Sequence, residues 1–255
     1  MRELLEAVAT GEISPAEAEA QISGYATGDG GRFDAARVER AGVPEAVLAA
    51  GKTPAEVADL VTTSLSTTGR AIATRAEDDH VTAIREHVER VEPAATVRWS
   101  ERSRWVVVHA PDFDRPDLDV SVGVVTAGTS DAVPAGEAAM IVREVGADVT
   151  RISDVGVASL ARVVDQLSTF RAQDVLIIAA GREGALPTVV AGLVDVPVIG
   201  LPVSTGYGHG GEGEAALSGM LQSCTALSVV NVDAGFTAGA QAGLIARRID
   251  NVAGE

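Results

Sequence analysis

The sequence predicts an α/β protein: a doubly wound parallel sheet of flavodoxin-like order, preceded by a smaller α/β domain. From Val120 onward, short apolar runs alternate with helical patterns, at the spacing typical of strand–helix–strand units. Runs such as Val175–Ile178 are continuously apolar, as expected for parallel strands covered on both faces. The chain before Pro111–Pro116, a linker pattern, is richer in charge, so we expect domains at 1–113 and 118–252.

Two helix starts carry the same signature in the N-terminal domain. Ser14–Glu17 and Thr53–Glu56 each place a capping hydroxyl before proline, with glutamate three residues after the hydroxyl. They predict helices over 15–24 and 54–66. A third helix is expected over 77–91, where Val81, Ile84 and Val88 follow helical spacing, and strands are expected over 71–75, 95–99 and 104–109.

The C-terminal half contains five candidate strands, at 120–126, 148–152, 175–180, 197–201 and 227–232. Each is followed by a loop rich in glycine, small hydroxyls or aspartate; these loops are Gly128–Asp131, Ser153–Gly156, Gly181–Gly184, Pro202–Gly211 and Asn231–Gly235. Because the carboxyl ends of parallel strands share one edge, the loops are expected to lie together, where ligands bind in such sheets. Loops often contain these residues for structural reasons alone, but five on one edge favour a nucleotide or phosphate pocket.

Composition excludes several classes of protein. The 255 residues include 36 acidic and 20 basic side chains, and the net charge of −16 disfavours binding to nucleic acid or to an anionic membrane. A hydrophobic share of 46% is too high for a disordered acidic chain. The chain shows no secretory signal or apolar run long enough to span a bilayer, and its single cysteine forms no internal disulfide, so we expect a cytoplasmic protein.

The basic residues are almost all arginine, with Lys52 the only lysine. Together with the acidic surface and an aromatic share of 3%, this indicates a halophilic host. A GC-rich mesophile explains the same composition, and both explanations stay open.

Several motifs resemble a known family. The segments Gly128–Asp131, Ala180–Pro187 and Pro197–Pro202 resemble the PurE-type aminoimidazole ribonucleotide (AIR) carboxylases and mutases. The likeness to the LarB family is more specific and covers nearly the whole chain; it rests on Asp154–Ala158, Glu183–Pro187, Gly206-Tyr207-Gly208, Met220–Cys224, Val230–Asp233 and, in the N-terminal half, Phe33-Asp34, Arg37, Arg40, Gly42, Pro44-Glu45, Gly51–Thr53 and Thr74-Arg75.

The LarB resemblance implies an enzyme of nickel-pincer nucleotide biosynthesis. Its substrate would be nicotinic acid adenine dinucleotide, whose pyridinium ring gains a carboxylate from CO2 or bicarbonate. Hydrolysis of the phosphoanhydride would then release AMP. The resemblance also implies a homo-oligomer with shared sites, and a divalent cation such as Mg2+ is plausible at the phosphates.

Cys224 is the candidate nucleophile. A pyridinium ring is too electron-poor to attack CO2, but addition of a thiolate creates a nucleophilic enamine, and the thiolate is later a good leaving group. The resemblance assigns this role to the cysteine of the Met220–Cys224 motif; an inert cysteine is the alternative. In a simple sheet Cys224 would lie at the edge opposite the glycine loops, so we expect either a bent helix or a site shared between subunits.

Other candidates lie at the strand exits. Glu183 and Asp154 are candidate catalytic carboxylates for proton transfer and orientation, with solvated or capping roles as the alternative. Asp131 and Asp233 are weak candidate metal ligands, and Lys52 is a candidate phosphate contact or an ordinary surface lysine. Candidate substrate-binding residues are Gly128, Thr129, Ser130, Asp131, Gly206 and Gly208.

The chain departs from the family pattern at several positions. Ala161 replaces a common histidine, which weakens a purine-pathway carboxylase or mutase most; His209 is either a substitute for that imidazole or an ordinary loop histidine. Arg182 and Thr237 stand where the family more often has methionine and glycine. A purine-pathway enzyme and a non-catalytic nucleotide-binding module therefore remain alternatives to the LarB-like carboxylase.

Overall fold

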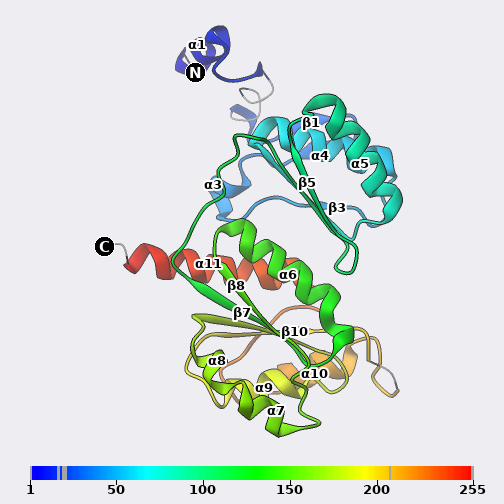
Figure 1. Cartoon of the computed structure of the whole chain (residues 1–255), viewed down its shortest axis with the longest axis vertical. Helices are drawn as coiled ribbons and strands as arrows, with labels where there is room; N and C mark the ends of the chain where they lie inside the picture. Colours follow the sequence, from blue (N-terminus) through cyan, green and yellow to red (C-terminus); the bar gives the residue numbers. More distant parts are fainter. Residues whose placement is uncertain (1, 16–17, 19–21, 207, 254–255) are drawn as a thin grey trace. The chain divides into compact units, whose positions relative to one another are not determined.

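The computed structural model describes residues 2–15, 18, 22–206 and 208–253. Internal contacts divide the chain into two units, Met1–Asp114 and Arg115–Glu255. Each unit has its own main sheet (Figure 1) and its own hydrophobic core. Within the described residues, no helix has both the length and the apolar character needed to cross a membrane.

The second unit is built on a five-stranded parallel sheet with the order β11-β10-β9-β7-β8. Its strands are β7 (Ser121–Thr126), β8 (Asp148–Ile152), β9 (Val175–Ala180), β10 (Val198–Pro202) and β11 (Ser228–Val229). In order along the chain, the second strand lies outside the first, and the third to fifth continue on the other side. This is the flavodoxin-like order that the sequence predicts, and the prediction is confirmed.

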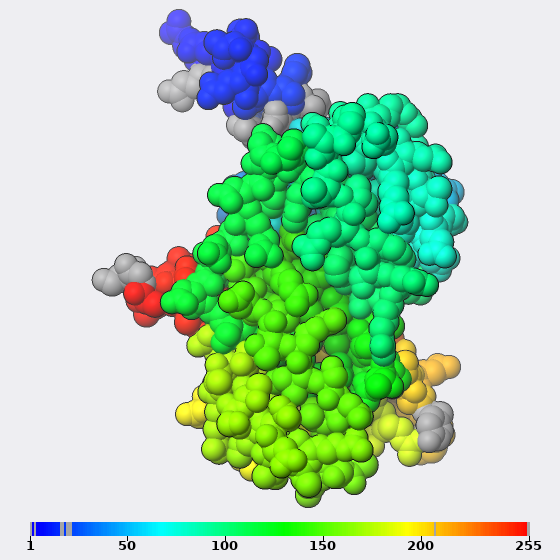
Figure 2. All heavy atoms as spheres, in the orientation of Figure 1, coloured from blue at the N-terminus to red at the C-terminus, as the bar shows by residue number. Residues whose placement is uncertain are grey.

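Helices cover both faces of this sheet (Figure 1). The helices α6 (Ala132–Val145) and α11 (Gly235–Ala253) pack against each other and against one face. The other face is covered by α7 (Leu160–Asp165), α8 (Leu167–Arg171), α9 (Ala185–Ala191) and α10 (Glu214–Leu221). Figure 2 shows yellow-green atoms, the colour of the part of the chain that holds α7 and α8, on the outer surface of this unit.

The central strand β9 explains the continuous apolar run in the sequence. All six of its residues are buried; Ile177 packs into the core on one face of the sheet, and Leu176 and Ile178 pack into the core on the other. Burying such a side chain contributes about 1.5–3 kcal/mol relative to exposure, so both faces need apolar residues.

The last strand is shorter than predicted. The sequence predicts a strand over 227–232, whereas β11 pairs with β10 only at Ser228 and Val229. Beyond them the chain keeps isolated hydrogen bonds to β10, from Val230 N to Gly200 O at 3.1 Å and from Asp233 N to Pro202 O at 2.9 Å. Since β11 is an edge strand, only one neighbour holds it in the ladder.

The first unit contains a four-stranded mixed sheet with the order β3-β4-β6-β5. Its strands are β3 (Val47–Leu48), β4 (Arg70–Thr74), β5 (Thr96–Ser100) and β6 (Trp105–His109), and the helices α4 (Pro54–Thr68) and α5 (Asp78–Val91) pack together on it. The predicted capping box of α4 is present: Thr53 Oγ1 accepts from Glu56 N at 3.3 Å, and Thr53 N donates to Glu56 Oε2 at 2.7 Å.

Several short elements of the first unit have no clear sequence signal. They are α1 (Arg2–Thr10), the hairpin of β1 (Ala26–Gly28) and β2 (Gly31–Phe33), α3 (Arg37–Ala41) and β3. Apart from α1, which has nine residues, these segments have two to five residues and are too short to display a period. Contacts with α4 hold the hairpin in place. The predicted helix over 15–24 falls largely outside the described residues and stays a prediction.

Candidate functional site

A cavity of ≈ 600 Å³ opens where the carboxyl ends of the parallel strands meet. Its walls come from the loops after β7, β8, β9 and β10, and they consist of Ala127, Gly128, Ser130, Asp131, Gly156, Val157, Ala158, Ala180, Gly181, Arg182, Glu183, Ala185, Leu186, Thr205 and Gly206. The volume lies in the range of small-molecule sites. The structure therefore brings four of the five predicted loops together at one edge.

Asp131 forms the buried polar centre of this cavity. It ends a single 3-10 turn (Thr129–Asp131) that joins β7 to α6, and it is only 3% exposed. Its Oδ2 accepts from Gly128 N at 2.8 Å, and its Oδ1 lies 3.5 Å from both Ser130 Oγ and Thr205 Oγ1. The carboxylate thus fixes the β7 loop and connects it to the loop after β10.

Burial raises the pKa of Asp131 above the ordinary aspartate value of 3.8 because the charged form loses hydration. Hydrogen bonds from Gly128 N, Ser130, Thr205 and Ala127 N oppose this rise by stabilising the carboxylate. The pKa of Asp131 is therefore set by two opposing features of the site, its burial and its hydrogen bonds, and burial has the larger effect.

Glu183 is held at the cavity by two tight backbone approaches. Gly184 has φ 66°, and a Cβ there would lie 2.5 Å from Ala216 O, so only glycine fits at the start of α9. A Cβ on Gly206 would lie 3.0 Å from Arg182 N, which shows how closely the loops after β9 and β10 approach. Glu183, an exposed residue, therefore lines the cavity from a constrained loop.

The predicted substrate-binding residues are nearly all at this edge. Gly128, Ser130, Asp131 and Gly206 line the cavity, and Gly208 lines an adjoining one. Thr129 lies in the same turn without lining either cavity. Tyr207, part of the glycine-loop motif, lies outside the described residues.

Asp154 follows β8 but does not line the cavity. It has φ 60°, its side chain is 59% exposed, and its Oδ2 lies 3.2 Å from Arg162 Nη1. The backbone after it reaches the cavity through Gly156 and Val157. The geometry therefore places Asp154 at the rim, paired with an arginine, rather than beside Glu183.

Cys224 lies at the other edge of the sheet. It is exposed and follows α10 just before β11 begins, which places it near the amino ends of the strands. The neighbouring Thr225 confirms the position, since its Cγ2 lies 3.8 Å from where a Cβ on Gly192 would be, at the far end of α9. The structure therefore does not bring Cys224 to the cavity of its own chain.

The two weak candidate metal ligands already accept backbone hydrogen bonds. Asp131 binds Gly128 N, and Asp233 Oδ1 accepts from Ser204 N at 3.0 Å. Across the described part of the chain, no group of three or more histidine, cysteine, aspartate or glutamate residues is placed to hold a metal ion. The donor set thus does not fit a resident metal centre.

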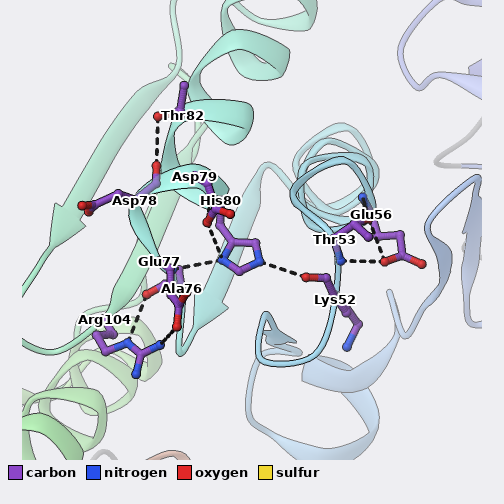
Figure 3. Close-up of polar contacts among 10 residues, drawn as sticks. All are labelled: Lys52, Thr53, Glu56, Ala76, Glu77, Asp78, Asp79, His80, Thr82 and Arg104. Atoms are coloured by element: carbon purple, nitrogen blue, oxygen red, sulfur yellow. Dashed lines mark hydrogen bonds and ion pairs between the residues drawn. The ribbon is translucent and has the colours of Figure 1, made fainter.

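Lys52 belongs to the first unit, in the loop between β3 and α4. Its Nζ donates to Leu48 O at 2.7 Å. The buried ring of His80 fixes the same loop: Nε2 lies 3.0 Å from Lys52 O, and Nδ1 accepts from Glu77 N at 3.0 Å (Figure 3). These contacts give Lys52 and His80 a structural role in joining the starts of α4 and α5.

The positions that depart from the family pattern fall in different places. Arg182 and His209 both line the adjoining cavity, whereas Ala161 and Thr237 are exposed on α7 and α11. Thr205 was not among the predicted site residues, although it contacts Asp131, which lies 74 residues earlier in the sequence. Its only signal was its place after a strand, in a loop already expected at this edge.

Comparisons with known proteins match both parts of the chain. A family model described as AIR carboxylase matches residues 121–254, and one described as LarB/PurE-like N-terminal domain matches residues 25–110. An uncharacterized protein of Methanocaldococcus jannaschii is 35% identical over 254 residues, which cover 97% of each chain.

Solved structures with similarity include two PurE proteins of Treponema denticola. PurE is 23% identical with a TM-score of 0.41 and covers 52% of this chain and 80% of its own. A serine-to-aspartate variant of PurE2 is 25% identical with a TM-score of 0.39 and covers 55% of this chain and 82% of its own.

Proposed function

Because the chain belongs to the AIR carboxylase family and carries a LarB/PurE-like N-terminal domain, we propose that it carboxylates the pyridinium ring of nicotinic acid adenine dinucleotide. CO2 or bicarbonate supplies the carboxylate, and hydrolysis of the phosphoanhydride releases AMP. The observation that carries the proposal is the cavity at the carboxyl edge, where Glu183 and the buried Asp131 stand among glycine loops suited to an anionic nucleotide.

The proposed first step is addition of the Cys224 thiolate to the pyridinium ring. The new C–S bond cancels the ring charge and leaves an enamine, whose nucleophilic carbon attacks CO2. Loss of the proton from that carbon and expulsion of the thiolate with its electron pair then restore the aromatic ring. Glu183 is the proposed acceptor of this proton because it is an acidic residue that lines the cavity.

The second step is attack of water on the phosphoanhydride. A P–O bond breaks, giving AMP and a dicarboxylated pyridinium mononucleotide. A divalent cation bound by the substrate's own phosphates is compatible with this step, since Mg2+ commonly binds phosphates with few protein ligands. No step is assigned to a resident metal.

Cys224 lies near the amino ends of the strands, away from the cavity of its own chain. We propose that its thiol enters the cavity of a neighbouring subunit in a homo-oligomer, because the five-stranded sheet separates it from the cavity of its own chain. A protein that is fully active as a monomer contradicts this arrangement.

The test is incubation of the full chain with nicotinic acid adenine dinucleotide, labelled bicarbonate and Mg2+. We expect label in a pyridine dicarboxylate together with free AMP, and loss of both in Cys224→Ala. Because the chain has one cysteine, alkylation of the wild type reports on this thiol alone and should also abolish turnover. Retained turnover in Cys224→Ala contradicts the proposed nucleophile.

The AIR carboxylase match makes a purine-pathway reaction the second candidate. Carboxylation of aminoimidazole ribonucleotide in the same assay, without labelling of the pyridine, would favour it. Saturable binding of the dinucleotide without any turnover would instead favour a non-catalytic module.

A further inference from the structure

Asp131 and Thr205 connect two loops of the cavity wall that lie far apart in the sequence. Asp131 ends the turn after β7, and Thr205 lies in the loop after β10. The Thr205 hydroxyl donates to Asp131 Oδ1 over a distance of 3.5 Å. The other donors to this carboxylate, Gly128 N, Ser130 and Ala127 N, belong to the segment between β7 and α6. Thr205 therefore supplies the contact that joins Asp131 to a second wall of the cavity.

The two oxygens of Asp131 have different surroundings. Oδ2 accepts from Gly128 N at 2.8 Å, whereas the contacts of Oδ1 with the Ser130 and Thr205 hydroxyls are 3.5 Å long. Oδ1 also faces Gly181, where a Cβ would lie 3.6 Å away. Because glycine has no side chain to cover it, Oδ1 is open to the cavity that both residues line, and it can accept a shorter hydrogen bond from a ligand.

The backbone in front of Thr205 is fixed by a third loop of the same edge. Ser204 N donates to Asp233 Oδ1 at 3.0 Å, and Asp233 N donates to Pro202 O at 2.9 Å. Asp233 follows β11, so the segment that carries Thr205 is held from the strand next to its own. A hydroxyl on a backbone held in this way can set the direction of a neighbouring carboxylate.

We propose that Thr205 is a positioning residue for the carboxylation: its hydroxyl holds Asp131 Oδ1 toward the substrate in the cavity. The inference rests on the proposed function, because it takes the dinucleotide as the molecule that fills the cavity. Asp131 then acts in substrate binding and Glu183 in proton transfer. Loss of the Thr205 hydroxyl should therefore weaken binding more than it slows the chemical step.

The test compares the wild type, Thr205→Val and Thr205→Ser in steady-state carboxylation, with nicotinic acid adenine dinucleotide as the varied substrate. Valine keeps the branched shape and removes the hydroxyl, whereas serine keeps the hydroxyl. The usual contribution of one hydrogen bond predicts that KM rises about fivefold in Thr205→Val, with kcat within about twofold of the wild type. Thr205→Ser should keep both constants within about twofold of the wild type.

A purely structural effect of the substitution would give a different result. A Cβ on Gly206 would lie 3.0 Å from Arg182 N, so a distorted loop after β10 would also displace the neighbouring Glu183 and lower kcat. Thr237→Val is the matched control and should change neither constant, since Thr237 is exposed on α11 and lines neither cavity. Wild-type KM in Thr205→Val, an equally raised KM in Thr205→Ser, or a fall in kcat as large as the rise in KM overturns the inference.

Hydrogen exchange tests the contact without any reaction. Gly128 N donates to Asp131 Oδ2, so a carboxylate that Thr205 no longer holds should let the Gly128 amide exchange about threefold faster. Mass spectrometry of the peptide that contains Gly128 measures this exchange in the wild type, Thr205→Val and Thr237→Val.

The two measurements separate the inference from the proposed function. Faster exchange in Thr205→Val, in a chain without carboxylase activity, would overturn the proposed function and support the positioning of Asp131 by Thr205. Equal exchange in Thr205→Val and the wild type overturns the inference at any level of activity, and an active wild type then leaves the proposed function standing.

Discussion

The two edges of the parallel sheet in the second unit differ in what their loops do. At the carboxyl edge, four loops surround a cavity and place Glu183 and the buried Asp131 on its walls. At the amino edge, the exposed Cys224 follows α10 in a short turn, where Ser223 Oγ and Thr225 Oγ1 lie 2.7 Å apart. The cavity and the exposed thiol of Cys224 thus lie at opposite edges of the sheet.

The difference shows that the strand topology decides at which edge a segment lies, independently of the chemistry that its residues could perform. The parallel topology alone directs the loops after β7, β8, β9 and β10 to a common edge. The same topology directs the segment before β11 away from that edge, whatever its chemistry. A reaction that uses both Glu183 and Cys224 therefore needs two chains.

The largest expected effect is on turnover at the carboxyl edge. Glu183→Gln removes the proposed proton acceptor and keeps the size of the side chain, so we expect turnover to fall by about a hundredfold or more. Asp148→Asn is the control, since Asp148 is an exposed acid at the start of β8, on the amino edge. The measurement is steady-state carboxylation. An equal fall in turnover in both variants would contradict a specific role of the carboxyl edge in catalysis.

A smaller effect is expected on stability, at the two ends of α9. Gly184 begins this helix with φ 66° and a Cβ position 2.5 Å from Ala216 O, so Gly184→Ala should lower the free energy of unfolding by about 2–3 kcal/mol. Gly192 ends the helix at φ −80° with 3.5 Å to the nearest atom, so Gly192→Ala should change it by less than about 1 kcal/mol. Urea unfolding of both variants measures the difference, and equal losses would contradict it.

The smallest effect concerns the pH dependence of stability. Burial raises the pKa of Asp131 above 3.8, so the folded state binds this proton more tightly than the unfolded state. As the pH rises from 3.8 through the raised pKa, this group should therefore lower the stability of the wild type. Asp131→Asn has no proton to lose and keeps an oxygen for Gly128 N, so its unfolding free energy should lack that decrease.

Unfolding curves of the wild type and Asp131→Asn across this pH range measure the effect. A wild type that instead gains stability relative to the variant as the pH rises would show that the hydrogen bonds from Gly128, Ser130 and Thr205 outweigh burial.

Local and periodic signals predicted most of the fold. The capping box at Thr53 and the helical spacing of Val81, Ile84 and Val88 depend on neighbours within a few residues, and both are confirmed. The continuous apolar run of β9 predicted a central strand for the same reason. The shortened β11 depends on an edge position that no local pattern reports.

The sequence predicted which residues of the candidate site lie at the same edge of the sheet, but not the contacts between their side chains. Strand order places Gly128, Asp131, Glu183 and Gly206 at one edge, and the cavity contains all four. The burial of Asp131 and its contact with Thr205 arise from packing between loops far apart in the sequence. Asp154 lies at the rim, where its side chain pairs with Arg162, eight residues along the chain. A contact between residues 74 positions apart gives no periodic pattern in a single sequence.

Complementation between two inactive variants gives the sharpest test of a site assembled from two chains. Co-expressed Glu183→Gln and Cys224→Ala subunits assemble at random, so some cavities combine an intact Glu183 with an intact Cys224 from a neighbour. We expect each variant alone to be inactive and the mixture to regain about a quarter of wild-type carboxylation. A mixture as inactive as its parents, beside an active wild type, would contradict the shared site.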